Sequence, residues 1–235
     1  FAYGPADAHR PAASPAPSPA AIEEAADLLA GAENPVVITS GLGLDRTTVP
    51  AFATMVERFA LPVVSFRPRY LNLPTDHPMH AGYDSAPFVK DADVILVIDS
   101  DVPWIPDLMP ANPDARVIHV GTDPLFQRLP IRGFPCHLAM TASSGMTIPA
   151  LTAALDLRAG TMAAKIEARR ARVAERKAKV ATGLAAGLER ARTANPIETP
   201  WLAHCLNEAL APEDILVRES QLPIPYLSRT VPGTY

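Results

Sequence analysis

Short aliphatic runs, separated by segments with helical periodicity, constrain the fold of this chain more than any other feature. The clearest run is Val94–Ile98, and others lie at Val36–Thr39, Val63–Phe66, Val117–Val120 and, more weakly, His137–Met140. Strands that are buried on both faces are apolar throughout rather than alternating. When such strands alternate with helices, they form a parallel sheet that helices cover on both sides. The sequence therefore predicts an α/β fold, a Rossmann-like doubly wound parallel sheet of five or six strands.

Helices are predicted between and after these runs. Ala21–Leu29, Thr47–Phe59 and Thr147–Leu157 have helical patterns, and a short helix is expected at Val89–Asp91. Residues 159–195 are rich in Ala, Arg, Lys and Glu, and predict one long helix with a thin apolar stripe. It has no aromatic residue, and acidic residues stand among its basic ones, unlike a nucleic-acid surface, so we interpret it as a largely solvated connector helix.

The chain divides into four stretches. Residues 1–18 are rich in Pro, Ala and Ser and predict an extended linker, and residues 19–158 hold the Rossmann-like pattern. The connector helix of residues 159–195 follows. Residues 196–235 contain a helical pattern at Pro200–Leu210 and a predicted buried strand at Ile215–Val217. This last stretch is interpreted as the incomplete start of a second α/β domain, so the chain is expected to be a fragment of a longer protein.

Composition excludes several classes of protein. The 235 residues are 48% hydrophobic with a net charge of −4, which gives no reason to expect a nucleic-acid or membrane partner. Cys136 and Cys205 are too few for a disulfide framework or a cysteine zinc site, and are expected to be reduced thiols in a cytoplasmic protein. No apolar run approaches the roughly 18 residues of a membrane span.

Ligands of doubly wound sheets bind beyond the carboxyl ends of the strands, which makes four loops candidate sites. The first loop runs from Ser40 to Leu44 and contains Gly41 and Gly43. Its glycines could cradle a nucleotide phosphate, or they could form a tight turn that needs positive φ. Arg46 stands where the dinucleotide-binding pattern needs a third small residue.

The other three loops carry small or acidic residues. Asp99 and Asp101 could hold a divalent ion or cap a turn. Asp123 could accept hydrogen bonds from a ribose or cap a helix that begins at Pro124. The loop Thr141–Gly145 could face a phosphate or simply turn the chain. These loops form a candidate nucleotide cleft with Ser40, Gly41, Gly43 and Asp123 as its binding residues.

The histidines do not predict a metal or catalytic site. His77 and His80 are separated by Pro78, which prevents a helical pair, and His119 lies within an apolar strand as a core residue. Residues 1–194 contain no sequence motif of a nucleophile elbow, a phosphate-binding loop or a zinc protease. We therefore assign no catalytic residue and no metal ligand to this chain.

Several short motifs, taken in order, resemble a known family. Together they are similar to the central domain of thiamine-diphosphate-dependent enzymes of the acetolactate synthase and benzoylformate decarboxylase type, and the last residues resemble the start of the diphosphate-binding domain. The resemblance covers residues 19–235. The motifs are Asn34–Gly41, Phe59–Val64, Asp76–Gly82, Ala92–Val97, His119–Pro124, Glu219-Ser220 and Pro232–Tyr235.

The resemblance implies a full-length enzyme of three α/β domains that acts on 2-oxo acids by decarboxylation or carboligation. Its cofactors would be thiamine diphosphate and magnesium, its partners the N- and C-terminal domains of the same chain, and its assembly a homo-oligomer, dimer or tetramer. Glu219, Ser220 and Gln221 match the loop that faces the cofactor diphosphate, although Gln221 and Leu222 replace small hydroxylic residues. The catalytic glutamate and the magnesium motif of the family are absent from this chain.

Two questions stay open at this point. The central domain binds FAD in acetolactate synthases, ADP in some relatives and no nucleotide in many others, and we expect an empty or vestigial cleft here. The fragment itself is predicted to be inactive. The alternative is a stand-alone Rossmann-like module that binds a nucleotide or coenzyme A.

Overall fold

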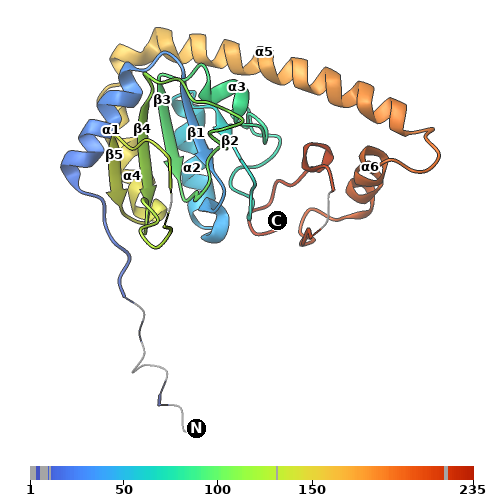
Figure 1. The fold of residues 1–235 in the computed structure, drawn as a ribbon, viewed down its shortest axis with the longest axis horizontal. Helices are drawn as coiled ribbons and strands as arrows, with labels where there is room; N and C mark the ends of the chain where they lie inside the picture. Colours follow the sequence, from blue (N-terminus) through green and yellow to red (C-terminus); the bar gives the residue numbers. More distant parts are fainter. Residues whose placement is uncertain (1–3, 6–9, 11, 131, 220–221) are drawn as a thin grey trace.

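A computed structural model describes residues 4–5, 10, 12–130, 132–219 and 222–235 of the chain. Five parallel strands form one sheet in the order β2-β1-β3-β4-β5 (Figure 1). The order reverses beside β1, because β2 lies on one side of it and β3 on the other. The strands are β1 Pro35–Thr39, β2 Val63–Val64, β3 Val94–Ile98, β4 Arg116–Gly121 and β5 Leu138–Thr141. The predicted α/β class and parallel sheet are confirmed.

The helices lie close to the predicted segments. Helix α1 is the first after the N-terminal stretch, and η2 immediately follows β1. The bounds are α1 Pro19–Gly31, η2 Leu42–Leu44, α2 Thr48–Arg58, α3 Ala86–Val89, α4 Ser144–Asp156, α5 Ala159–Ala191, α6 Thr199–Ala209 and η3 Ile224–Tyr226. The short helix predicted at Val89–Asp91 is observed at Ala86–Val89. It begins three residues earlier and ends two residues earlier than predicted.

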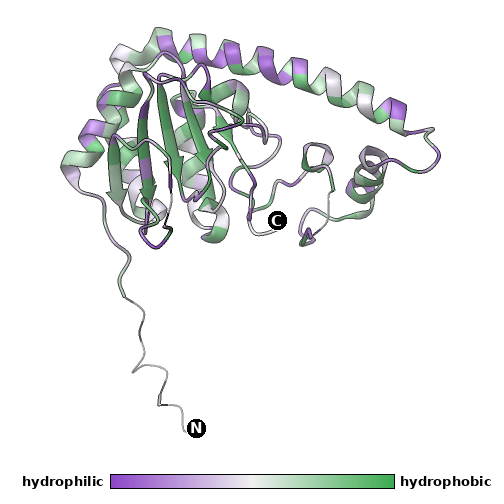
Figure 2. Ribbon diagram, in the orientation of Figure 1, coloured by the Kyte–Doolittle hydropathy of each residue, from purple (hydrophilic) through white to green (hydrophobic). Residues whose placement is uncertain are grey.

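Both faces of the sheet are buried, which explains the uninterrupted aliphatic strands. One face packs against α1, α2 and α4 and includes Val37, Leu96 and Ile118. The opposite face, with Val36 and Ile95, packs against α3 and the loop after β3. Hydropathy colouring shows the strands as the most apolar part of the molecule (Figure 2). Helices thus cover the two faces unequally, because a short helix and a loop take the place of longer helices on the second face.

The strand predicted at Val63–Phe66 is shorter than expected. Its ladder ends at Val64, because the N–H of Ser65 donates to the carbonyl oxygen of Gly82 at 3.0 Å and Arg67 has a positive φ of 47°. Ser65 and Phe66 nevertheless remain buried. The apolar run therefore predicted burial correctly and strand length incorrectly.

The strand predicted at Ile215–Val217 is wrong among the described residues. Ile215 is 70% exposed and Val217 is 87% exposed, and the segment belongs to no sheet. Leu216 donates its N–H to the carbonyl oxygen of Thr234 at 2.8 Å. This single backbone hydrogen bond does not make the segment part of a β-sheet. A β-branched run forms a buried strand only when neighbouring strands cover it, and none does so here.

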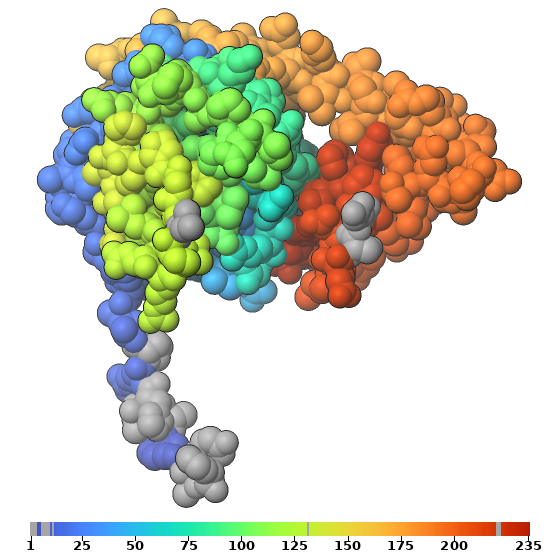
Figure 3. Space-filling model, in the orientation of Figure 1, coloured from blue at the N-terminus to red at the C-terminus, as the bar shows by residue number. Residues whose placement is uncertain are grey.

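The last described residues lie against the loop that follows β2. The N–H of Leu71 donates to the carbonyl oxygen of Tyr235 at 2.9 Å, and that of Thr75 donates to Arg229 at 3.0 Å. The space-filling view shows an opening beneath α5, between this C-terminal segment and the sheet (Figure 3). A cavity of about 720 Å³ lies there, with Phe88 and Leu184 among its lining residues.

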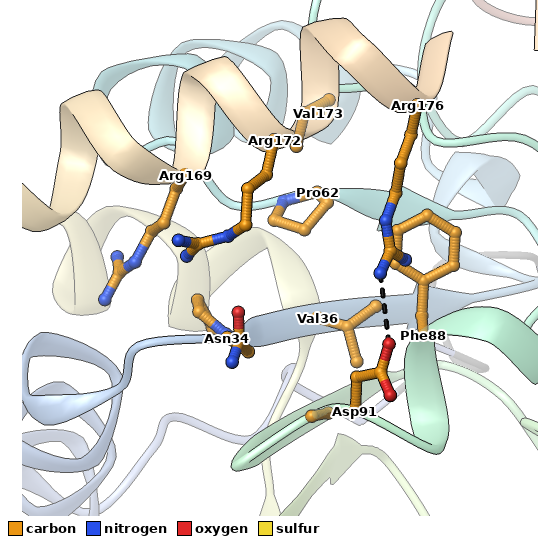
Figure 4. A pocket seen from close by; sticks show the side chains of 11 residues that line it. Asn34, Val36, Pro62, Phe88, Asp91, Arg169, Arg172, Val173 and Arg176 are labelled. Atoms are coloured by element: carbon orange, nitrogen blue, oxygen red, sulfur yellow. Dashed lines mark hydrogen bonds and ion pairs between the residues drawn. The ribbon is translucent and has the colours of Figure 1, made fainter. Parts of the chain in front are cut away.

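Helix α5 crosses the edge of the sheet at which the strands begin and then extends beyond it towards α6 (Figure 1). Most of its residues are exposed, as its thin apolar stripe predicted, but Arg169 is only 2% exposed. Figure 4 shows Arg169, Arg172 and Arg176 reaching from this helix towards the start of the sheet. Arg176 pairs with Asp91 at 3.1 Å. The basic residues thus attach the helix to the domain.

Candidate functional site

The four loops named from the sequence line one cleft at the carboxyl edge of the sheet. The cleft has a volume of about 340 Å³ and lies where the strand order reverses, which is the position of ligand sites in doubly wound sheets. Gly41, Asp99, Gly121, Asp123 and Ser144 all contribute to its lining. Topology therefore brings together residues that are up to about 100 positions apart in the chain.

The glycines of the first loop do not have the backbone conformation that a tight left-handed turn needs. Gly41 has a φ of −119°, and Gly43 also lies outside the left-handed region. The turn with positive φ is therefore a wrong interpretation. Both glycines are required by close approach instead, since a Cβ on Gly41 would lie 2.9 Å from the carbonyl oxygen of Asp99. A Cβ on Gly43 would lie 2.2 Å from that of Leu71.

The backbone N–H groups of both glycines already have acceptors within the protein. The N–H of Gly41 donates to the carbonyl oxygen of Asp99 at 2.9 Å, and that of Gly43 donates to Oδ1 of Asn72 at 3.0 Å. Ser40 is buried, with its hydroxyl 3.4 Å from the same Asp99 oxygen. A phosphate cradle needs free N–H groups that point at the ligand. Ser40, Gly41 and Gly43 thus hold the loop against its neighbours.

Asp99 directly follows β3 and lines the cleft. Its φ of 48° is uncommon for a residue with a side chain, and such conformations often mark functional positions. Burial raises the pKa of its carboxyl group. Ser144, the first residue of α4, also lines the cleft. Asp99 and the N-terminus of that helix therefore border the same space.

Asp45 holds a second carboxylate at the beginning of a helix. Its Oδ1 accepts the N–H of Thr47 at 3.0 Å and the hydroxyl of Thr47 at 2.6 Å, while Oδ2 lies 3.3 Å from the Thr48 hydroxyl. The side-chain hydrogen bond from Thr47 is the main cause that lowers the pKa of Asp45. Thr47, which precedes α2, does not cap the helix with its own side chain, and the N–H of Thr48 donates to the carbonyl oxygen of Asp45 at 3.0 Å.

Asp123 lines the cleft and also supports its own loop. Its Oδ1 accepts the N–H of Gln127 at 3.3 Å, and its carbonyl oxygen accepts the N–H of Phe126 at 3.2 Å. No helix begins at Pro124 within the described part of the chain. Asp123 therefore stabilises a turn, and its exposed carboxylate still faces the cleft.

Asp101 makes different contacts from those of Asp99. Its carboxylate pairs with the guanidinium of Arg69 and accepts the N–H of Val102 at 3.0 Å. No cluster of three or more His, Cys, Asp or Glu side chains suited to a metal ion occurs among the residues that the structure covers. Asp101 is thus paired with a cation, whereas Asp99 lines the cleft.

His119 is a buried core residue, as its strand predicted. Its Nε2 lies 3.1 Å from the carbonyl oxygen of Pro135, and burial lowers its pKa to about 4. His80 is also buried, with its pKa lowered to about 4 mainly by the same cause. His77 contacts Glu57 at 3.6 Å through Nε2. These imidazoles are neutral at pH 7 and do not form one cluster with a carboxylate pair.

The loop expected to face the cofactor diphosphate is only partly described. Glu219 is exposed, and Ser220 and Gln221 lie outside the described residues. Arg218, the preceding residue, donates from Nε to the hydroxyl of Tyr235 at 3.0 Å. It lines an adjoining open cleft of about 820 Å³ together with Arg46. Glu219 is not among the residues that line the cleft at the strand ends.

Sequence reasoning missed Asp45, Arg69 and Tyr70, which also line the cleft. Asp45 could have been found, because Asp followed two residues later by Thr is a common side-chain turn at a helix start. Arg69 and Tyr70 lie in an irregular segment whose path follows from tertiary contacts. The N–H of Arg69 donates to the carbonyl oxygen of Ser40 at 2.9 Å, which brings the segment to the cleft.

Comparison with known families supports the resemblance seen in the motifs. Residues 22–129 match the model for the central domain of thiamine pyrophosphate enzymes. This part of the chain is similar to that domain. The matched region runs from α1 to the loop after β4, and so contains most of the cleft.

Two solved structures are similar to this chain in fold. Benzoylformate decarboxylase from Polynucleobacter necessarius is 16% identical with a TM-score of 0.68, over 100% of this chain and 43% of that one. A protein from Mycobacterium smegmatis, described as a candidate thiamin diphosphate-dependent enzyme, is 19% identical with a TM-score of 0.55, over 66% of this chain and 31% of that one. This chain thus spans less than half the length of either. No curated protein matches it by sequence. Within the described residues, no helix combines the length and apolarity that crossing a bilayer requires.

Proposed function

We propose that this chain is part of a thiamine-diphosphate-dependent enzyme that acts on 2-oxo acids, and that it supplies the structural central domain without catalytic residues. The observation that carries the proposal is the match of residues 22–129 to the central-domain family. The reaction would be decarboxylation or carboligation, as in acetolactate synthases. Thiamine diphosphate would supply a carbanion-stabilising ring when bound.

The described residues fit a supporting role better than a catalytic one. Asp45 accepts hydrogen bonds at the start of α2, Asp101 pairs with Arg69, and the buried His119 contacts a carbonyl oxygen. A general base would need a side chain free to reach a substrate proton. We therefore place thiamine diphosphate and magnesium in other parts of the full-length protein, with Glu219, Ser220 and Gln221 as the residues of this chain nearest to the diphosphate.

The domain boundaries belong to the same proposal. Residues 1–18 would be a linker, residues 19–158 the central domain, residues 159–195 the connector helix and residues 196–235 the beginning of the diphosphate-binding domain. The partners would be the other domains of the same protein, in a homo-oligomeric enzyme with a cytoplasmic location. The extensive attachment of α5 to the central domain supports its role as the element that connects two domains.

Turnover measurements test the proposal. Carbon dioxide release from pyruvate and benzoylformate would be measured with residues 1–235 and with the protein from the uninterrupted gene, each with thiamine diphosphate and Mg²⁺. We expect turnover only from the longer protein. Decarboxylation by residues 1–235 alone would contradict the assignment of a supporting role. A longer protein that neither binds thiamine diphosphate nor turns over a 2-oxo acid would contradict the proposed enzyme class.

A further inference from the structure

Two helix N-termini converge in the cleft at the carboxyl edge of the sheet. A Cβ on Gly145, in the first turn of α4, would lie 3.2 Å from the hydroxyl oxygen of Thr48, the first residue of α2. The same Cβ would lie 3.7 Å from Oδ2 of Asp45. Helix N-termini carry partial positive charge and unpaired N–H groups, so a pair of them is a natural position for a phosphate.

The chain places its own carboxylates at both helix ends. Asp45 accepts from the N–H and hydroxyl of Thr47 at the start of α2. The carboxyl group of Asp99 lies in the same cleft as Ser144, the first residue of α4. Each carboxyl group stands where a bound phosphate would otherwise lie.

Four further donors around the cleft are engaged within the protein. The N–H groups of Gly41 and Gly43 donate to Asp99 and Asn72. The N–H of Ser143 donates to the carbonyl oxygen of Pro15 at 2.9 Å, and the guanidinium of Arg69 pairs with Asp101. A phosphate entering the cleft would meet carboxylates and find these donors already occupied. Like charges at close range oppose its binding.

We propose that Asp45 and Asp99 act as resident anions that exclude phosphorylated ligands, including FAD and ADP, from the central cleft. This inference goes beyond the proposed function because it concerns ligand selection by the cleft and not turnover. It attributes the exclusion of phosphorylated ligands to two carboxyl groups. The absence of a glycine-rich phosphate loop alone would not identify any excluding residue. Asn at either position keeps a hydrogen-bond acceptor and removes the charge.

Isothermal titration of residues 1–235 tests the inference without any turnover assay. FAD, ADP and inorganic pyrophosphate would be titrated at low ionic strength into the unaltered chain and into Asp45→Asn, Asp99→Asn and the double variant. We expect no saturation of the unaltered chain up to about 1 mM ligand. Each single variant should bind pyrophosphate at least about fivefold more tightly than the unaltered chain. Asp114→Asn is the matched control, since Asp114 is exposed and precedes β4 at the opposite edge of the sheet.

Two results would overturn the inference. One is saturable binding of FAD or ADP by the unaltered chain. The other is unchanged pyrophosphate affinity in charge-removal variants that circular dichroism shows to be folded, because exclusion would then have a cause other than the two carboxylates. Since Asp45 also caps α2, Asp99→Asn alone is sufficient for a decision if Asp45→Asn does not fold.

Discussion

The guanidinium of Arg169 donates a hydrogen bond to the carbonyl oxygen of Phe59, 3.1 Å away, and both residues are buried. The same side chain donates to the carbonyl oxygens of Leu29 at 2.9 Å and Ala32 at 2.5 Å. These carbonyl groups lie at the C-terminal ends of α1 and α2, where the helix dipoles are negative. One buried cation on α5 therefore joins the ends of two other helices.

We expect Arg169→Ala to lower the free energy of unfolding by about 3–5 kcal/mol, because it leaves buried carbonyl groups without donors. Urea denaturation followed by circular dichroism measures the change. Arg170→Ala is the control, since this neighbouring side chain is more exposed and contacts the single backbone carbonyl of Glu57. If Arg169→Ala lowered the free energy of unfolding no more than Arg170→Ala does, the buried hydrogen bonds of Arg169 would contribute little to stability.

Gly43→Ala is expected to destabilise the domain by about 1–3 kcal/mol, because the new methyl group would overlap a backbone oxygen rather than a movable side chain. Gly183→Ala, in the exposed part of α5 with no atom near its Cβ position, should instead stabilise the helix by about 0.5–1 kcal/mol. Thermal unfolding of the two variants measures the opposite signs. Equal thermal unfolding midpoints for the two variants would contradict the close approach of Gly43 to Leu71.

Asp45→Ala should cost about 0.5–2 kcal/mol near pH 7, as loss of a helix cap commonly does. The folded-state pKa of Asp45 is lowered. Its contribution is therefore present above the ordinary aspartate pKa of 3.8 and is lost as the pH falls through the lowered value. Unfolding measured from pH 7 down to pH 3 should show the variant approaching the unaltered chain. A constant difference over that range would mean that the charge is unimportant to the cap.

His119→Gln should reduce the acid sensitivity of the domain. Burial lowers the folded-state pKa of His119 to about 4 from an ordinary 6.5, so the unfolded chain binds more protons between these values. Stability is then complete above pH 6.5 and falls towards pH 4, by up to about 2 kcal/mol at pH 5 from this group. Gln can still donate to Pro135 and does not titrate.

Urea denaturation at pH 7 and pH 5 measures that difference, with His204→Gln on α6 as the control. His80 shares the lowered pKa, so His119→Gln should remove part of the acid sensitivity and not all of it. An unchanged difference between the two pH values in a folded His119→Gln variant would rule out a contribution from this residue.

Much of the fold followed from local patterns. Val94–Ile98 was predicted as a buried strand and is one, with the same bounds, because an all-aliphatic segment between turns has few other ways to be buried on both faces. The same reasoning failed at Ile215–Val217, which has equally suitable residues. A strand needs neighbours to pair with its backbone and cover its side chains, and the residues alone do not supply them.

The cleft likewise has some features that followed from the sequence and others that followed only from the tertiary structure. The sequence by itself determined the parallel sheet, the order of its helices and the loops at its carboxyl edge, because hydrophobic periodicity and turn residues act over short distances. The tertiary structure alone decided that Asp45 and Asp99 line one cleft, that Gly41 and Gly43 are needed for close packing, and that Arg169 is buried. Each of these three features depends on contacts between residues that are distant in the sequence. A local sequence pattern contains no information about such contacts.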